Sequence, residues 1–367
     1  MKILFPFVGD SVGGSHHSII ELHRELCKNN IPSVIVVHQK GPLSLFLEDA
    51  GVLYEYLPIQ KFAGEKPNIF SILYGIFVNF NKIYGYIQRN GISIVHGNDL
   101  RVNLTWSFPT KLSHASYVWH QRTTMSSSYL WSSIYLLADY FVTISSYVHE
   151  TLPDNILSSN KKLILNPFDT TTIYNKTKSR HFIESAYSIP KNVLIVGYIG
   201  RLVEWKNVDF LIKCISEYSN DSIRLLIVGT GKDKYVSKLK NLARNCDSIV
   251  TFAGFNNNPN KIIAGLDLMV APSNTEPFGR TLIESMIQKT PVLAAKGGGH
   301  MEIIRHGDTG WLYDHGNITD FITQLHKIMQ KGKVVDSAVQ RAYMHACSKY
   351  SSAEHAKNII SIYNRLY

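Results

Sequence analysis

The sequence of 367 residues predicts an α/β protein of two doubly wound domains that face a cleft. A chain of this length is long for one hydrophobic core and comfortable for two domains of ordinary size. Short apolar strands alternate with helical patterns in both halves, which is typical of sheets covered by helices. Residues 166–192, between the halves, are rich in Thr, Asn, Lys and Pro, and we interpret them as the interdomain connection.

The first half begins with a short apolar strand at Lys2–Phe7, then a glycine-containing turn and an amphipathic helix. Later strands end in polar residues. Parallel sheets place their working groups at the carboxyl ends of strands, so these ends are candidate sites. The further strands expected in this half are Ser33–His38, Ser93–Asp99, Ser116–Arg122 and Ala138–Ser145.

The second half restarts the same pattern of strand and helix. Helices are expected near Asn207–Tyr218 and Lys234–Arg244, and a helical tail runs roughly from Val335 to Tyr367. The expected strands are Val193–Gly200, Arg224–Gly231 and the segments IVTFAG, LDLMVAPS and PVLAAK.

The composition indicates a well-packed protein, since 45% of the residues are hydrophobic and 11% aromatic. Four cysteines (Cys27, Cys214, Cys246 and Cys347) are scattered without a CxxC pair, and we interpret them as reduced structural residues of a cytosolic protein. The longest apolar stretch, Ile69–Phe80, has twelve residues, whereas a bilayer span needs about twenty. We therefore expect a cytoplasmic protein, soluble or peripheral to the membrane.

The formal net charge of +10 lies mostly in the second half. Residues 1–175 hold 13 Lys and Arg against 12 Asp and Glu, whereas residues 176–367 hold 25 against 16. This excess suits an anionic ligand such as a diphosphate, although a solvated basic surface accounts for most of these lysines. No basic run is interleaved with aromatic residues, so a nucleic-acid partner is not expected.

Two short segments have the residue types that bind phosphate. Arg201 and Lys206 follow a strand end and precede a helix, an arrangement that favours a pyrophosphate site. Gly13 and Gly14 precede the first helix, where bare N–H groups can bind an anion. The alternative for Arg201 and Lys206 is an ordinary exposed pair of cations. The alternative for Gly13 and Gly14 is a tight strand-to-helix turn.

Two glutamates bound the segment EPFGRTLIE. Pro277 lacks an N–H and holds the loop extended after Glu276. Phe278 and Gly279 are expected to start a helix with N–H groups available to phosphate or to a sugar hydroxyl. Glu284 lies among apolar residues of that helix, where a lone buried carboxylate is costly unless it accepts hydrogen bonds. The two hydroxyls of a ribose would satisfy it; the alternative is a solvated helix face.

Four segments together resemble the family 4 retaining glycosyltransferases, which have the GT-B fold of two Rossmann-like domains. The signature E-x7-E spans Glu276 to Glu284, and the resemblance covers nearly the whole chain. It implies an acceptor-side domain of residues 1–170, to which a C-terminal helix (350–367) crosses back, and a nucleotide-sugar donor-binding domain of residues 171–349. The segments are GG (13–14), GRLVEWKN (200–207), EPFGRTLIE (276–284) and GGGHMEIIRHGDTGWLYD (297–314).

The resemblance implies roles for the donor-side residues. The backbone at Gly13 and Gly14 would touch the donor β-phosphate. The side chains of Arg201 and Lys206 would neutralise the diphosphate, and Glu284 would bind the ribose hydroxyls.

Two residues are the catalytic candidates that the resemblance implies. Glu276 would contact hydroxyls of the donor sugar, aided by the backbone at Phe278 and Gly279. His120 matches the histidine that the family places near that sugar; its alternative is an ordinary hydrogen-bonded residue at a strand end. The acceptor-side candidates, by position only, are Asp10, His16, His96 and Asn98, and His16 has the alternative of capping the first helix.

No Asp-x-Asp motif occurs in the chain. A carboxylate-held divalent cation is the usual clamp for a nucleotide diphosphate in other transferases, and here Arg201, Lys206 and helix N-termini would replace it. Neither a metal nor another cofactor is therefore expected. Catalysis would consist of charge stabilisation on the leaving diphosphate and of positioning. The family retains the anomeric configuration, and front-face attack, with the leaving phosphate taking the acceptor's proton, is the working hypothesis.

The function implied is transfer of a hexose or N-acetylhexosamine from a UDP- or GDP-sugar to a glycan acceptor. A lipid-linked acceptor is expected, as in lipopolysaccharide O-antigen, capsule or exopolysaccharide assembly. The sequence leaves the base, the sugar, the linkage and the oligomeric state open. One alternative is a sugar-nucleotide 2-epimerase, but the segments E-x7-E and GRLVEWKN argue against it. The other is a non-catalytic glycan- or nucleotide-binding subunit, and the intact charged residues Arg201, Lys206, Glu276 and Glu284 argue against that one.

The segment Lys66–Arg89 is rich in Ile, Phe and Tyr. A helix of this kind could lie on the cytoplasmic face of the membrane or guide a lipid-linked acceptor. The alternative is a helix that packs against the core of the first domain.

Overall fold

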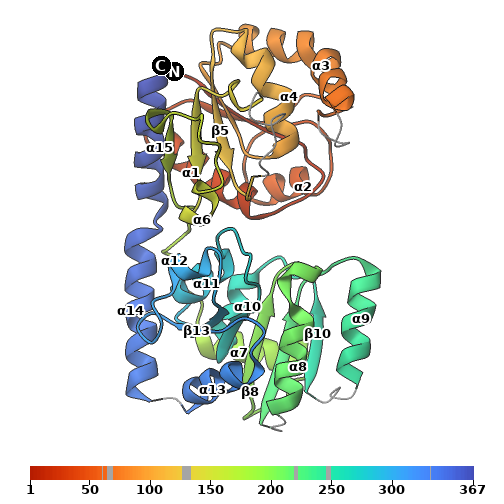
Figure 1. The fold of residues 1–367 in the computed structure, drawn as a ribbon, viewed down its shortest axis with the longest axis vertical. Helices are drawn as coiled ribbons and strands as arrows, with labels where there is room; N and C mark the ends of the chain where they lie inside the picture. Colours follow the sequence, from red (N-terminus) through yellow and green to blue (C-terminus); the bar gives the residue numbers. More distant parts are fainter. Residues whose placement is uncertain (60, 64–68, 126–133, 219–221, 245–248, 331) are drawn as a thin grey trace. The chain divides into compact units, whose positions relative to one another are not determined.

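The computed structural model describes residues 1–367 apart from 60, 64–68, 126–133, 219–221, 245–248 and 331. The chain forms two compact units, Met1–Asp169 with Ser351–Tyr367 and Thr170–Tyr350, which we call the N-terminal unit and the C-terminal unit (Figure 1). Each is built on a parallel sheet flanked by helices, so the α/β fold predicted from the alternation of strands and helices is confirmed. The sequence predicts domains of residues 1–170 with 350–367 and of residues 171–349.

The N-terminal unit has a seven-stranded sheet in the order β3-β2-β1-β4-β5-β6-β7. Its central strands are buried along their whole length, which explains why they read as continuous apolar runs instead of alternating ones. The strands are β1 (Ile3–Phe7), β2 (Ser33–Val37), β3 (Glu55–Tyr56), β4 (Ile94–Gly97), β5 (Ser116–Gln121), β6 (Tyr140–Thr143) and β7 (Lys161–Leu163).

The helices of this unit present apolar stripes to the sheet. In the first helix, Ile19, Leu22 and Leu26 are buried at helical spacing. The helices are α1 (Gly14–Lys28), α2 (Pro42–Asp49), α3 (Ile69–Arg89), α4 (Leu100–Lys111), α6 (Ser146–His149) and α15 (Ser352–Leu366), with a 3-10 turn, η1 (Ser158–Asn160).

The C-terminal unit has a six-stranded sheet in the order β10-β9-β8-β11-β12-β13. Its strands are β8 (Leu194–Ile199), β9 (Ile223–Val228), β10 (Val250–Gly254), β11 (Leu268–Ala271), β12 (Val292–Ala295) and β13 (Trp311–Tyr313). Its helices are α7 (Lys176–Ala186), α8 (Val208–Tyr218), α9 (Asp233–Ala243), α10 (Pro259–Gly265), α11 (Arg280–Ile287), α12 (His300–Ile303), α13 (Ile318–Met329) and α14 (Lys333–Lys349), with a 3-10 turn, η2 (Glu204–Lys206).

Strand order reverses once in each sheet. β1 pairs in parallel with both β2 and β4, and β8 pairs with both β9 and β11. In doubly wound sheets, ligands bind outside the carboxyl ends of the strands at such a reversal. The two places to search for a site are therefore the loops after β1 and β4, and those after β8 and β11.

The interpretation of residues 166–192 as a plain connection is wrong in part, because α7 lies within them. Asn175 caps this helix by accepting a hydrogen bond from the Lys178 backbone N–H. Its inward face is small, with Ser179 and Ile183 buried, and it packs against α10 of the same unit. Because the rest of the helix surface is polar, the sequence of α7 shows no clear helical repeat of apolar residues.

The helical tail consists of two helices that belong to different units. α14 ends at Lys349 in the C-terminal unit, and Ser351 starts α15 by accepting a hydrogen bond from the Glu354 N–H. α15 packs against α1, and its Ile359, Ile362 and Tyr363 lie in the core of the N-terminal unit (Figure 1). The C-terminal helix is thus part of the first unit, as expected.

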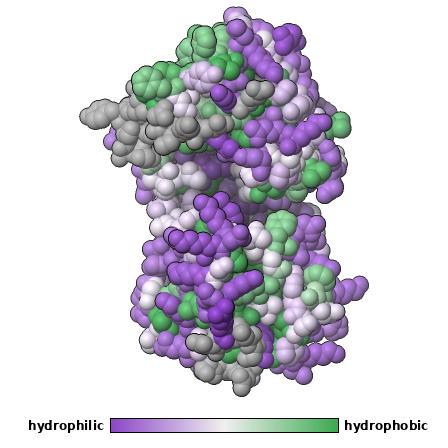
Figure 2. Space-filling view, turned by 90° about the vertical axis from the view of Figure 1, so that its right-hand side faces the viewer, coloured by the Kyte–Doolittle hydropathy of each residue, from purple (hydrophilic) through white to green (hydrophobic). Residues whose placement is uncertain are grey.

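One helix of the N-terminal unit has both a buried face and an exposed apolar face. α3 buries Ile72, Ile83 and Ile87 against the core. On its other side, exposed apolar residues recur: Phe70 (80% exposed), Leu73 (56%), Tyr74 (53%), Phe77 (82%) and Val78 (50%). Figure 2 shows hydrophobic surface at the top of the view, the end of the N-terminal unit where α3 lies in Figure 1.

The helix in the segment Lys66–Arg89 therefore packs against the core of the N-terminal unit, as the alternative interpretation had it, and it also exposes apolar residues. Residues 66–68 lie outside the described part. None of the described helices is long and apolar enough to cross a membrane.

Candidate functional site

The loops after β8 and β11 meet at the strand reversal of the C-terminal unit. Parallel pairing of Leu268 with Val196 and of Met269 with Gly197 aligns the two strands, so their carboxyl ends lie at one edge of the sheet. The loop after β8 carries Arg201 and Lys206, and the loop after β11 carries Glu276. The fold thus brings together the cations and the carboxylate that the sequence singled out.

Lys206 and Glu276 form an ion pair across these loops. Their side chains are only 19% and 16% exposed, and the Lys206 ammonium also lies over the Trp205 ring, 4.4 Å from its centroid. This pairing was not foreseen, because the sequence suggested separate roles for the two residues. A diphosphate that binds Lys206 has to share its ammonium with Glu276, which three N–H donors allow.

Arg201 lies nearby and is exposed. Its backbone carbonyl accepts a hydrogen bond from the Tyr198 hydroxyl (2.8 Å), which fixes the start of the loop. No carboxylate within the described part of the chain pairs with its guanidinium. Arg201 is therefore a cation available to an anionic ligand at the strand reversal.

Glu284 has a partner within its own helix. The Arg280 guanidinium lies 3.4 Å from its carboxylate, one turn earlier in α11, and the Glu284 side chain is 17% exposed. The sequence argument took this glutamate as one that lacks a partner and looked to ribose hydroxyls. Because Arg280 pairs with Glu284, this carboxylate does not need ribose hydroxyls as its partners. Its oxygens can still accept hydrogen bonds from a ligand.

The helix after Glu276 starts later than expected. Gly279 has a φ of +108° and forms the N-cap, so α11 begins at Arg280 and not at Phe278. Phe278 is buried and its ring lies 6.0 Å from that of Tyr350. The Leu282 N–H donates to the Gly279 carbonyl (3.1 Å). The N–H groups at the start of an α-helix can bind an anion, and in α11 that start lies at Arg280.

The glycines of GGGH support the loop that carries Glu276. The Gly299 N–H donates to the Glu276 carbonyl (2.8 Å), and a Cβ on Gly298 would come within 2.4 Å of the same oxygen. A Cβ on Gly297 would lie 2.3 Å from the Asn274 carbonyl. Only glycine permits this backbone contact, so the triplet positions Glu276. The sequence motif GGGH did not predict this role of the glycines.

His300 is a further residue of this neighbourhood that sequence reasoning missed. It is buried, and its Nδ1 lies 3.1 Å from the Ala295 carbonyl. Burial lowers the pKa of His300, and the nearby charge of Glu276 opposes that effect. A neutral ring with its proton on Nδ1 follows, because a carbonyl can only accept.

In the N-terminal unit, Gly13 and Gly14 stand at the start of α1. Gly13 has an extended backbone (φ −154°), and a Cβ there would meet only His16 Nδ1 at 4.0 Å. Neither backbone strain nor a close contact demands glycine at position 13. His16 accepts the Gly13 N–H (2.9 Å), which confirms its interpretation as a helix cap, and burial lowers its pKa to about 4.

The other acceptor-side candidate on the β1 loop, Asp10, is paired. Arg101 donates to both of its carboxylate oxygens, at 2.8 and 3.2 Å, and this hydrogen bonding lowers the pKa of Asp10. Arg101 also lies 3.4 Å from Asp99, which caps α4. Arg101 could not be singled out from the sequence, because its partner Asp10 lies 91 residues away.

His96, Asn98 and His120 gather around one arginine. Arg122 donates to the Asn98 side-chain oxygen (2.7 and 3.1 Å) and to His120 Nδ1 (3.3 Å), and His96 Nε2 lies 3.0 Å from the same His120 atom. Both histidines are fully buried, and burial lowers their pKa values well below the usual range. The arrangement is a neutral histidine pair held by a cation.

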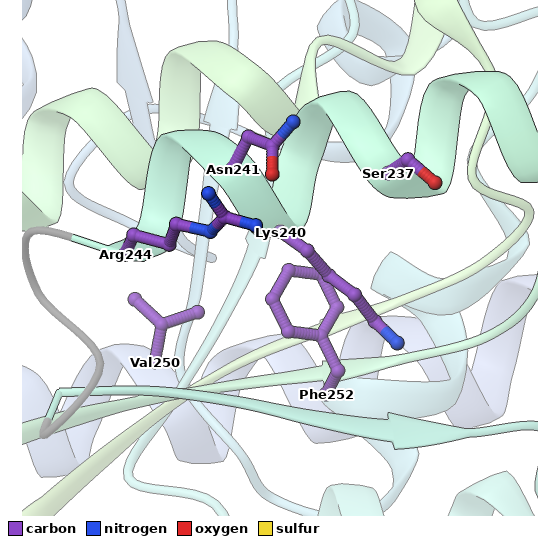
Figure 3. A pocket seen from close by; sticks show the side chains of 6 residues that line it. All are labelled: Ser237, Lys240, Asn241, Arg244, Val250 and Phe252. Atoms are coloured by element: carbon purple, nitrogen blue, oxygen red, sulfur yellow. The ribbon is translucent and has the colours of Figure 1, made fainter.

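Figure 3 shows a hollow of about 460 Å³ at a different part of the C-terminal unit. It lies beside β10, the edge strand of the sheet, and not at the strand reversal. None of the candidate residues lines it. Its lining residues are Ser237, Lys240, Asn241, Arg244, Val250 and Phe252.

Comparison with known proteins agrees with this geometry. Residues 179–345 match the family Glycosyl transferases group 1. The matched residues lie within the C-terminal unit. They include both loops of the strand reversal, with Arg201, Lys206, Glu276 and Glu284.

Two curated relatives match part of the chain. The granule-bound starch synthase 1 of Ipomoea batatas is 33% identical over 149 residues, 39% of this chain and 24% of that protein. The N-acetyl-alpha-D-glucosaminyl L-malate synthase of Bacillus anthracis is 25% identical over 223 residues, 58% of this chain and 57% of that protein. The chain thus spans between a quarter and just over half of their lengths.

A solved structure shows the fold of the whole chain. The Anabaena protein HepE, in complex with UDP and glucose, has a TM-score of 0.86 and 19% identity, covering 99% of each chain. The two units therefore have the GT-B fold, as the resemblance implied.

Gly298→Ala tests whether the glycine triplet supports the Glu276 loop. We expect it to lower the free energy of unfolding in urea by roughly 1–3 kcal/mol more than Gly307→Ala, because its methyl group would overlap the Glu276 carbonyl. Gly307 is the matched control: it also has a positive φ (+76°), but a Cβ there meets nothing within 4 Å. Equal losses in the two variants would contradict the contact.

The neutral histidines of the N-terminal unit predict a loss of stability in mild acid. Burial lowers the pKa of His38 to about 4 and that of His355 to about 3, so the unfolded chain binds protons that the folded chain does not as the pH falls below about 6.5. Between pH 7.5 and 5 we expect a loss of about 2 kcal/mol for each such histidine in urea denaturation.

The matched variants for this measurement are His355→Gln and His326→Gln, the latter exposed on α13. His355→Gln should flatten the pH dependence and His326→Gln should not. A wild-type protein equally stable at pH 5 and 7.5 would show that these histidines titrate normally.

Proposed function

We propose that the protein is a retaining glycosyltransferase that moves a hexose or N-acetylhexosamine from a nucleotide-diphosphate sugar to a glycan acceptor. The observation that carries the proposal is the set of Arg201, Lys206, Glu276 and Glu284 on the loops after β8 and β11 and in α11, within the residues that match the family Glycosyl transferases group 1. The C-terminal unit is the proposed donor-binding domain and the N-terminal unit the acceptor side.

In this proposal the donor diphosphate lies at the strand reversal of the C-terminal unit. The Arg201 guanidinium and the Lys206 ammonium bind its phosphate oxygens, and no divalent cation or other cofactor is required. Glu284 accepts from the ribose hydroxyls while its other oxygen stays near Arg280. Glu276 accepts from hydroxyls of the sugar, and Gly13 and Gly14 of the other unit offer N–H groups to the β-phosphate.

The reaction proceeds on one face of the sugar. The bond from the anomeric carbon to the diphosphate oxygen breaks, and its electron pair goes to the diphosphate, whose charge Arg201 and Lys206 stabilise. The acceptor oxygen forms the new bond, and its proton passes to the leaving phosphate. Glu276 and Glu284 are each held by a cation, which supports binding roles over a role as nucleophile.

The donor proposed first is a UDP-sugar. The HepE complex contains UDP and glucose. The relatives include a granule-bound starch synthase and an N-acetyl-alpha-D-glucosaminyl L-malate synthase, so a glucosyl or an N-acetylglucosaminyl donor is the natural starting point. The acceptor proposed is a lipid-linked glycan of a surface polysaccharide, and GDP-sugars are the alternative donors.

Calorimetric titration of UDP, UDP-glucose, UDP-N-acetylglucosamine and GDP-mannose, with EDTA present, tests the donor site. We expect UDP and one UDP-sugar to bind, and Arg201→Gln to raise Kd roughly 10- to 100-fold because a charge-assisted hydrogen bond is lost. Glu284→Gln should weaken binding by a comparable factor. Lys240→Gln, which removes a cation from the hollow in Figure 3, is the control and should leave Kd unchanged.

Three results would count against this assignment. They are no binding by any of the nucleotides, binding only after Mg²⁺ or Mn²⁺ is added, and equal weakening by Arg201→Gln and Lys240→Gln.

We further propose that the exposed face of α3 rests on the cytoplasmic face of the membrane that carries the acceptor. Phe70, Leu73 and Phe77 project from one side of the helix, and the Lys61 ammonium lies 5.0 Å from the centroid of the Tyr74 ring at its margin. An apolar face with a cation beside it suits an interface with anionic lipid.

Co-sedimentation with vesicles of phosphatidylcholine, with and without phosphatidylglycerol, tests this contact. The wild-type protein should sediment with the anionic vesicles, and Phe70→Ser with Phe77→Ser should reduce the partition coefficient by roughly 10-fold or more, because two exposed rings that would insert into the lipid are lost. Phe255→Ser, at a 74% exposed ring of the C-terminal unit, is the control. A wild-type protein that stays in the supernatant, or a loss shared by the control, would refute the membrane contact.

A further inference from the structure

The 3-10 turn η2, which follows β8, holds the backbone of Lys206 in a fixed position. The Lys206 N–H donates to the Val203 carbonyl (3.0 Å), which closes the turn. Asn207 ends the turn in the left-handed region (φ +52°), and its Nδ2 lies 2.8 Å from His315 Nε2 in the loop after β13. The turn is therefore tied down at both ends, and only the lysine side chain remains to be ordered.

Two contacts order the ammonium group of Lys206. Glu276 forms an ion pair with it, and the Trp205 ring lies against it, with the ring centroid 4.4 Å from Nζ. A lysine side chain has four carbons with rotatable bonds between them, so fixing it costs conformational entropy. Contacts that exist before a ligand binds remove that cost from the binding step.

The two contacts differ in their consequence for an anionic ligand. The Glu276 carboxylate compensates the charge of Lys206, so a diphosphate competes with it for the ammonium. An aromatic ring attracts a cation through the negative face of its π-system but has no net charge. The Trp205 ring can therefore hold the ammonium while the charge and the remaining N–H donors of Lys206 stay available to phosphate oxygens.

The Trp205 side chain is not part of a hydrophobic core. It is 38% exposed, whereas Trp106 and Trp119 are completely buried and Trp311 is only 6% exposed. Its ring therefore lies at the surface of the loop that carries Arg201 and Lys206, where it can act on a residue that binds a ligand.

We propose that Trp205 is a positioning residue of the donor site, and that its ring holds the Lys206 ammonium in place for the diphosphate by a cation–π contact. This role rests on the proposed transferase function, which supplies the diphosphate. All of the residues involved belong to the C-terminal unit. Tryptophan attracts cations more strongly than the other aromatic side chains, so phenylalanine should keep part of the effect and leucine none.

Proton NMR of the protein without ligand tests the contact itself. The ε-methylene protons of Lys206, assigned by loss of their signals in Lys206→Met, should resonate upfield of those of other lysines, because they lie near the face of an indole ring. Trp205→Phe should keep much of the upfield shift, and Trp205→Leu should abolish it. Lys206 signals at the ordinary position in the wild-type protein would overturn the proposal.

Calorimetric titration of UDP, with EDTA present, tests the consequence for binding. Trp205→Leu should raise Kd roughly 2- to 5-fold, as expected for loss of a cation–π contact at a partly exposed site, and Trp205→Phe should restore most of the affinity. In the Lys206→Met background, Trp205→Leu should have no further effect, because the ring acts through Lys206. An unchanged Kd in Trp205→Leu, or a further loss in the Lys206→Met background, would overturn the positioning role.

The matched control is Tyr343→Leu, which removes a ring whose centroid lies 4.6 Å from Lys289 Nζ. Tyr343 belongs to α14 and lies outside the loops of the strand reversal. Its loss should change neither the Lys206 signals nor the Kd of UDP, and an equal weakening by both variants would contradict a specific role of Trp205.

Failure of the transferase proposal is distinguishable from failure of this one. If UDP, UDP-glucose, UDP-N-acetylglucosamine and GDP-mannose all fail to bind the wild-type protein, the donor site is refuted, and the role of Trp205 in donor binding is refuted with it. If UDP binds with the same Kd in Trp205→Leu as in the wild-type protein, only the positioning role is refuted.

Discussion

The parallel pairing of β8 with β11 is the constraint on which the candidate donor site depends. Lys206 and Glu276 are 70 residues apart, and they meet because the strands that precede them are neighbours at the point where the strand order reverses. Crossover helices leave the sheet in opposite directions there, which keeps the loops accessible. The equivalent parallel pairing of β1 with β4 places the loop after β1 and the loop after β4, which carries Asn98, at one edge of the sheet of the N-terminal unit.

The ion pairs within the candidate donor site determine the net charge that a ligand meets there. In the C-terminal unit, Glu276 is held by Lys206 and Glu284 by Arg280, which leaves the charge of Arg201 uncompensated by any described carboxylate. These ion pairs orient the two carboxylates before a ligand binds. The five charged side chains of the site together have a small net positive charge. An anionic ligand gains from that charge, and the sugar part of a ligand meets oxygens whose positions are already fixed.

The sequence was most informative where signals are local. Strand positions followed from apolar runs, and EPFGRTLIE and GRLVEWKN marked the loops of the strand reversal. Contacts between distant residues had no such signal: the Lys206–Glu276 pair and the meeting of His96 and His120 depend on sheet order. The helix α7 was missed because so little of it is buried, and Arg280 was overlooked as the partner of Glu284 although the four-residue spacing was visible.

The assignment of α15 to the N-terminal unit also bears on how the protein is made. Residues 170–350 form the other unit, so the ribosome synthesises that unit before the helix that completes the core around Ile3 and Ile19. The C-terminal unit can fold while the N-terminal unit still exposes part of its apolar interior. The unit that is synthesised first is therefore the one that finishes folding last.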